Sequence, residues 1–277
     1  MHIPHATGIL GRVAMLSVIG IVVSCTGNAD PYFQSELIFP LQEQHTHSST
    51  IAQCPNGDFI ACWFQGSGER RSMDVELVGA RLRSGESAWS APFPMADTRN
   101  FPDCNPVLFV DRRGELWLFW IAVPAERWED SLLRFRRSRD YEGDGPPKWH
   151  WQDLMLFDPG DRFVQAAEEG LAELAARYPE PEPRMKWFLM RDMPRILKAA
   201  KNLSVRQRGW MTRCRPEVLP SGRILLPLYS DGFLFGLMAI SDDDGASWRP
   251  SAPIVGAALN QPSLARKKDG TLVAYMR

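Results

Sequence analysis

Cysteine and histidine are the residues whose spacing would reveal redox or metal chemistry most directly. The chain has five of each, and no two cysteines form the Cys-x-x-Cys pair that is typical of zinc and thioredoxin-type sites. Three histidines lie beyond residue 24, namely His45, His47 and His150. These counts predict no metal-ligand cluster and no metal-dependent chemistry.

Four cysteines lie in the body of the chain: Cys54, Cys62, Cys104 and Cys214. Cys54 and Cys62 flank one predicted hairpin, but a two-residue turn at Asn56-Gly57 would not place them directly opposite each other. A disulfide between them is one interpretation. We favour the other, in which all four are small buried residues.

A more specific pattern lies at residues 241–248, which read Ser-Asp-Asp-Asp-Gly-Ala-Ser-Trp and fit S-x-D-x-G-x-x-W. The side chains of Ser241 and Asp243 are suited to bond backbone amides, and Gly245 can take the positive φ of a tight turn. Trp248 then supplies a large aromatic plug between neighbouring β units. The motif predicts a structural turn between two strands rather than a catalytic group.

These groups must be positioned by a repeated β unit. Four stretches share one pattern, in which a short strand, a glycine turn and a second strand follow each other, with glycines at Gly57, Gly114, Gly222 and Gly270. The glycines are separated by 57, 108 and 48 residues. Repeats of about 40–50 residues are typical of four-stranded propeller blades, so the pattern predicts such blades.

The longest of these intervals holds an insertion. Between residues 161 and 202 apolar residues recur at helical spacing, and a proline-rich stretch at 179–183 interrupts them. We therefore expect a helical insertion over residues 160–207, between the second and third blades. We interpret it as a packing or lid element in preference to a separate functional module.

The motif at 241–248 is the Asp-box, and it lies in phase with the repeat. Excepting the insertion, residues 36–277 resemble the sialidase (neuraminidase) superfamily, in particular its bacterial BNR/Asp-box branch. The resemblance implies an all-β, six-bladed propeller, of which this sequence supplies about three and a half blades. We therefore expect the chain to be a C-terminally truncated part of a longer protein. Asp-boxes also occur in other propellers, so they identify the fold better than the reaction.

The resemblance also implies a site. Sialidases remove a terminal sialic acid with three arginines on the sugar carboxylate, a tyrosine–glutamate nucleophile pair and an aspartate acid/base, and they need no cofactor. His47 stands where the first of these arginines is expected, and Gln261 stands where the glutamate is expected. Arg277 matches the second arginine. The third arginine and the nucleophilic tyrosine would lie beyond Arg277.

The expected acid/base lies in the loop at residues 66–74, with Asp74 as the first candidate and Glu69 as the second. In the alternative interpretation Asp74 only begins the next strand, and Glu69 pairs in solvent with Arg70 or Arg71. Further sugar contacts are expected from Arg213 and Arg215, which lead into the third blade, and from residues 229–232, which leave its second strand. Ordinary polarity of the blade edge is the alternative interpretation for these residues.

The first residues of the chain predict export. An apolar run at residues 13–23 is too short to cross a bilayer, which needs about 20 residues, and it follows a basic residue, so residues 1–24 are expected to be a signal peptide. Residues 22–25 read Val-Val-Ser-Cys and resemble a bacterial lipobox. Cys25 would then carry the lipid that attaches the protein to the cell envelope. A plain secretory signal or a short membrane anchor is the alternative.

Composition excludes one class of partner. The chain has 32 Lys+Arg against 33 Asp+Glu, so it lacks the positive charge that nucleic-acid binding requires. The resemblance makes a glycan the expected partner and exo-glycoside hydrolysis, with release of a terminal sialic acid or related acidic sugar, the expected function. The alternatives are a non-catalytic carbohydrate-binding propeller and a scaffold for protein interaction.

Overall fold

We describe the fold from a computed structural model, which describes residues 33–277. The expected signal peptide at 1–24 and the expected lipidation site Cys25 lie outside the described residues, and both remain predictions. The chain divides into two units, of which the first ends at Phe39 and the second comprises residues 40–277. All further description concerns the second unit. In the described part of the chain, no helix combines the length and apolar character needed to cross a membrane.

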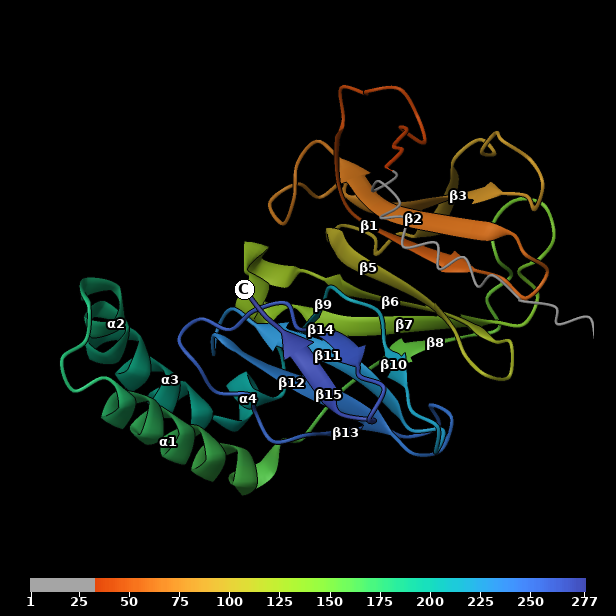
Figure 1. The fold of residues 1–277 in the computed structure, drawn as a ribbon. Coiled ribbons are helices and arrows are strands. Elements are labelled where there is room, and N and C mark those ends of the chain that lie inside the picture. Colours follow the sequence, from red (N-terminus) through yellow and green to blue (C-terminus); the bar gives the residue numbers. More distant parts are fainter. Residues whose placement is uncertain (1–32) are drawn as a thin grey trace, which may run out of the picture. The chain divides into compact units, whose positions relative to one another are not determined.

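Most of the second unit consists of antiparallel sheets, whose strands follow each other in chain order (Figure 1). The first sheet contains β1 (His45–Gln53), β2 (Phe59–Gly66), β3 (Glu76–Leu82) and β4 (Phe93–Ala96). The second contains β5 (Asp103–Val110), β6 (Leu116–Ala122), β7 (Leu132–Ser138) and β8 (Trp151–Leu154). Two short 3-10 helices, η1 (Pro124–Glu126) and η2 (Trp128–Asp130), lie between β6 and β7.

Two further sheets follow in the sequence. The third contains β10 (Glu217–Val218), β11 (Ile224–Ser230), β12 (Phe235–Ser241) and β13 (Arg249–Pro250), with β9 (Met211–Thr212) paired to β11. The last is a hairpin of β14 (Ser263–Arg266) and β15 (Leu272–Tyr275). The structure thus confirms the expectation of a mostly β chain built from antiparallel sheets.

The turn between β1 and β2 differs from the predicted two-residue turn. Gln53 pairs with Phe59, and the Cys54 N–H donates to the Asp58 carbonyl at 2.7 Å, so residues 55–57 form a three-residue loop. Gly57 closes the loop at a φ of +89°, a conformation that L side chains rarely adopt.

The four cysteines within residues 33–277 are free thiols, which excludes the disulfide interpretation among them. Cys62 pairs across the first sheet with Thr50, so it does not face Cys54. Cys54, Cys62 and Cys104 are buried, as expected, whereas Cys214 is only half-buried. The expectation that all four are buried was therefore wrong at Cys214, which precedes the short strand β10 rather than lying inside a sheet.

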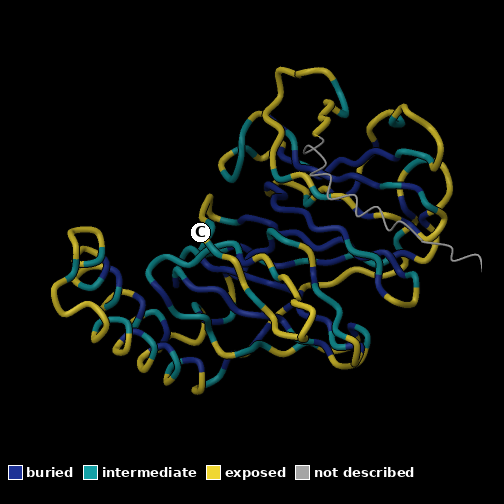
Figure 2. Tube along the Cα trace, viewed as in Figure 1, coloured by how far each residue is buried: buried dark blue, intermediate teal, exposed yellow. Residues whose placement is uncertain are grey.

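The core lies between the sheets. All seven residues of β6 are buried, because the second sheet is covered on both of its faces. β1 and β5 pack against each other, and the Leu108 N–H of β5 donates to Thr50 Oγ1 of β1 at 3.1 Å. Figure 2 shows burial concentrated in the strands of the first three sheets, whereas most residues of β14 and β15 are exposed.

Helices occupy the chain between the second and third sheets. They are α1 (Gly160–Arg177), α2 (Pro183–Trp187), the π-helical segment η3 (Phe188–Asp192), α3 (Met193–Ala200) and α4 (Leu203–Arg206). Helix α1 buries Phe163, Ala167 and Leu171, which recur every four residues on one face. The Phe163 ring packs edge-on against Trp210 and Phe233, with centroid distances of 5.9 and 5.1 Å. This aromatic contact attaches α1 to the loop between β11 and β12.

The Asp-box forms a tight turn after β12. The Ser241 hydroxyl donates to Asp243 Oδ1 at 2.8 Å and accepts the Gly245 N–H at 2.8 Å, while Asp243 Oδ1 accepts the Ser247 N–H at 2.9 Å. A hydrogen bond from the Ser247 hydroxyl to Asp243 Oδ2, followed by the bonds from the Ser247 N–H and the Ser241 hydroxyl, lowers the pKa of Asp243 to about 2.

The tryptophan of the same motif reaches into the neighbouring sheet. Trp248 lies edge-on to Trp117 and Phe119 of β6, with centroid distances of 6.1 and 6.0 Å. Edge-to-face geometry at such distances is favourable for aromatic rings. The motif therefore connects the third sheet to the second.

Candidate functional site

A repeated irregularity of the backbone lies at the centre of the candidate site. Ser48, Asn105 and Gln261 each lie nine residues before the turn glycine of their repeat, and their φ values are 56°, 52° and 54°. In β1 and β5 the strand register shifts at this position. Such bulges turn the neighbouring side chains out of the regular alternation of a strand. The repeat thus presents polar residues from equivalent positions of successive sheets.

Asn105 uses this position to connect the second and third sheets. Its buried amide donates to the Tyr229 hydroxyl at 3.2 Å, and its Oδ1 accepts from Arg213 Nη1 at 3.3 Å. Its carbonyl accepts from the Thr212 hydroxyl at 2.8 Å. Burial raises the pKa of Tyr229, although hydrogen bonds from Gln261 and Asn105 oppose the rise. Tyr229 therefore stays protonated at neutral pH.

Charged groups from distant parts of the chain affect the pKa of His47 in β1. Burial lowers the pKa of its imidazole, and the guanidinium of Arg213, which directly follows β9, lowers it further. Arg277, which follows β15, has the same sign of effect, whereas the Glu69 carboxylate opposes it. The charges that act on His47 thus link it to three other predicted site residues, Arg213, Arg277 and Glu69.

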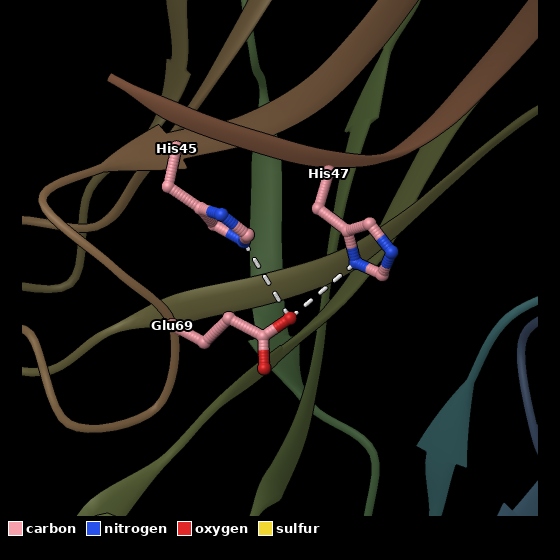
Figure 3. A group of neighbouring side chains, drawn as sticks. All are labelled: His45, His47 and Glu69. Atoms are coloured by element: carbon pink, nitrogen blue, oxygen red, sulfur yellow. Dashed lines mark ion pairs between the residues drawn. The ribbon is translucent and has the colours of Figure 1, made fainter. Parts of the chain in front are cut away.

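His45 was not predicted, yet it belongs to the same group (Figure 3). Glu69 Oε1 lies 3.6 Å from His45 Nε2 and 3.5 Å from His47 Nδ1. Residues two apart on a strand share a face, and this spacing could have identified the histidine pair. Potential ligand atoms of His45, His47 and Glu69 lie within 4.8 Å of one another. The sequence counts predicted no metal-ligand cluster because they did not consider that two of the histidines share a strand face, and the absence of a metal stays a prediction.

A second carboxyl group lies beside Arg277. Asp231 follows β11, and its Oδ1 accepts from the Asn260 amide at 3.1 Å, while the backbones of Asn260 and Arg277 bond each other at 3.0 and 3.1 Å. Burial raises the pKa of Asp231, and the nearby Glu129 carboxylate raises it further, against the opposing charges of Arg70 and Arg277. Glu129 lies in η2 and was missed, because nothing in the sequence marks that loop as a neighbour of Asp231.

Two predicted residues, Asp74 and Arg215, are exposed. The Asp74 carboxylate is exposed and accepts from the Ser67 amide at 3.0 Å and from the Ser67 hydroxyl at 2.7 Å. The hydroxyl bond from Ser67 lowers the pKa of Asp74. Arg215 is exposed, two residues beyond Arg213. Asp74 therefore closes its own loop in the structure.

We call His45, His47, Glu69, Arg213, Asp231 and Arg277 the mixed-charge site. Its two guanidinium groups could bind a carboxylate, because planar N–H forks match carboxylate oxygens. Its carboxyl group with a raised pKa, that of Asp231, could hold a proton closer to neutral pH than an ordinary aspartate. The site can therefore combine anion binding with proton transfer.

Comparison with known proteins agrees with this architecture. Residues 57–161 match the family described as a BNR repeat-like domain. No curated protein matches the sequence. Among solved structures, a protein of unknown function from Dyadobacter fermentans has a TM-score of 0.57 at 16% identity, covering 87% of this chain and 64% of that one.

Two sialidase structures are similar to the same extent. A leech intramolecular trans-sialidase has a TM-score of 0.57 at 13% identity, over 89% of this chain and 50% of that one. A sialidase from Streptococcus pneumoniae has a TM-score of 0.58 at 10% identity, over 87% of this chain and 50% of that one. The chain thus spans half to about two thirds of the length of these structures, and at such identities the likeness shows a shared fold. Residues 57–161 therefore match a BNR repeat-like domain, and the chain shares the fold of these sialidase structures.

Proposed function

We propose that the protein is a sialidase-like exo-glycoside hydrolase that releases a terminal sialic acid or a related acidic sugar from glycans. The observation that carries the proposal is that two arginines lie beside the polar groups around the end of β11. Arg213 donates to Asn105, whose amide donates to Tyr229. The backbone of Arg277 bonds that of Asn260, whose amide donates to Asp231. Two arginines at one polar site suit a sugar that bears a carboxylate. The leech relative was solved with 2,7-anhydro-Neu5Ac, an acidic sugar of this class.

In this proposal Asp231 donates the proton. A general acid works best when its pKa lies near the working pH, and the pKa of Asp231 is raised by burial and by Glu129. The proton passes to the glycosidic oxygen as the bond from that oxygen to the sugar breaks. Water then adds to the sugar, and its proton returns to the Asp231 carboxylate.

The roles predicted for Asp74 and Glu69 remain predictions. The lowered pKa of Asp74 makes it a weaker proton donor at neutral pH, which favours Asp231 in that role. Glu69 faces two histidines rather than an arginine, and this geometry suggests a different use for its carboxylate. We further propose that the four-stranded sheets are blades of a six-bladed propeller of the sialidase type.

A non-catalytic carbohydrate-binding protein is the second candidate function. Gln261 favours it, because it stands where the resemblance implies a glutamate, and an amide cannot accept a proton as a carboxylate would. This candidate predicts that acidic glycans bind at the mixed-charge site and are not cleaved.

The two candidates are separated by measuring binding and turnover on the same variants. We expect Arg213→Ala to weaken binding of a sialyl oligosaccharide at least about tenfold, the loss of a charge-assisted bidentate contact. Arg215→Ala is the matched control, because that arginine is exposed and only two residues away. Cleavage of an aryl sialoside that Asp231→Asn abolishes supports the hydrolase. Arg213-dependent binding without cleavage supports the second candidate, and equal effects of the two arginine variants would contradict both.

A further inference from the structure

A compact group is formed by His45, His47 and Glu69. The proposed hydrolysis assigns no role to His45 and does not explain why the three side chains lie together. The two histidines are two residues apart on β1, so they share one face of the strand. Both pack against the ring of Phe64, with centroid distances of 5.9 and 5.5 Å. This packing restricts the imidazoles to one side of the strand. The single oxygen Glu69 Oε1 then lies close to a nitrogen of each ring, at 3.6 and 3.5 Å (Figure 3).

These distances fit a shared metal ion. Two ligand atoms that each lie about 2.0–2.2 Å from one ion are about 3.3–3.6 Å apart at the tetrahedral angle. Both nitrogen-to-oxygen distances fall within or at the edge of that interval, and all three ligand atoms lie within 4.8 Å of one another. Imidazole nitrogen with carboxylate oxygen is a ligand set that suits zinc and similar divalent ions.

The group is also accessible. The exposed fractions of the three side chains are 40%, 49% and 36%, for His45, His47 and Glu69 in that order. An ion could therefore enter from solvent. With three protein ligands it would keep a coordination position open, as catalytic zinc sites do and structural zinc sites do not.

We propose that His45 Nε2, His47 Nδ1 and Glu69 Oε1 bind a divalent transition-metal ion of the zinc class in an open, three-ligand site. The ion adds positive charge to the mixed-charge site, which also contains the guanidinium groups of Arg213 and Arg277. Without an anion, these arginines weaken the binding of the ion by repulsion. A bound anionic sugar offsets that repulsion, so the ion and the sugar strengthen each other's binding by the same factor. This second part rests on the proposed function, whereas metal binding itself does not.

Metal binding is tested by titrating the chelator-treated protein with zinc chloride in a calorimeter and with cobalt(II) chloride in a spectrophotometer. We expect one ion per chain. We expect His45→Ala and Glu69→Gln each to weaken zinc binding by at least about tenfold, because even supporting groups around a metal contribute that much. His150→Ala is the matched control, since His150 Nε2 pairs with one carboxylate, Glu115 at 3.0 Å, and is not part of the three-residue group.

Circular dichroism and thermal unfolding establish that each variant is folded, and His45→Asn provides a second, smaller change at the same position. Absence of zinc binding by the wild-type protein, or equal zinc affinity of wild type and both His45 variants, would overturn the site. The coupling is tested by repeating the zinc titration with saturating N-acetylneuraminate, which should tighten zinc binding several-fold. An unchanged zinc affinity would overturn the coupling. Neither readout depends on turnover, so a failed hydrolase assay cannot be mistaken for a failed metal site.

Discussion

Replacing Gly245 with alanine would place a methyl group in the contact between the third and second sheets. A Cβ at this position would lie 2.6 Å from Trp117 Cζ2 and closer still to Cη2. Trp117 is fully buried, so its ring cannot move aside into solvent. The φ of Gly245 is also +81°, which L residues rarely adopt. The substitution therefore combines backbone strain with overpacking.

The two costs can be separated. A left-handed conformation costs an L residue roughly 1–2 kcal/mol, and overpacking a closely packed core costs about 1–3 kcal/mol. Gly85 has nearly the same φ, +82°, but no atom lies within 4 Å of a Cβ built there. Gly85→Ala should therefore cost only the backbone part, and Gly245→Ala should lower the free energy of unfolding by about 1–3 kcal/mol more.

Urea unfolding followed by far-UV circular dichroism measures this difference. Both variants should keep the wild-type m-value, because the surface exposed on unfolding does not change. If the two variants lost the same free energy of unfolding, within about 0.5 kcal/mol, the contact of the Asp-box turn with Trp117 would not be the constraint that the structure indicates.

Two further predictions concern the same framework. The folded-state pKa of Asp243 is about 2, below the usual 3.8 of the carboxyl group, so its bonds stabilise the fold above pH 4 and the stabilisation is lost as the pH falls toward 2. Asp243→Asn should therefore lower the urea midpoint at pH 7, and the difference from wild type should shrink between pH 4 and 2; a difference that stays constant would contradict this. Asn105→Ala removes the buried amide that bonds Tyr229 and Arg213, and it should lower the free energy of unfolding by about 1–3 kcal/mol. The same measurement checks it, and an unchanged urea midpoint would show that Asn105 does not connect the two sheets energetically.

Local features of the fold could be predicted from the sequence. The strand pairs around Gly114 and Gly222 and the turn around Gly245 depend on residues a few positions apart, so their chemistry is visible in the chain itself. The length of the β1–β2 turn was mispredicted, because Asn56-Gly57 fits both a two-residue turn and the observed three-residue loop.

The composition of the site depended on longer-range packing. Arg277 was singled out by the resemblance and Arg213 by its place before the third blade, but the effect of their charges on His47 depends on packing between distant parts of the chain. Burial raises the pKa of Asp231, and Glu129, about a hundred residues earlier in the chain, raises it further; no local pattern joins these two residues. Asp74, the first choice for the acid, instead bonds Ser67 within its own loop.

The central claim is that the mixed-charge site cleaves an acidic glycoside. Its most direct test is the release of fluorophore from a 4-methylumbelliferyl sialoside by the purified protein, measured beside Asp231→Asn and Asp74→Asn. We expect turnover by the wild type, a loss of at least about a hundredfold in kcat for Asp231→Asn, and a much smaller loss for Asp74→Asn. No turnover by the folded wild type on sialosides and related acidic glycosides, or full activity of Asp231→Asn, would contradict the account.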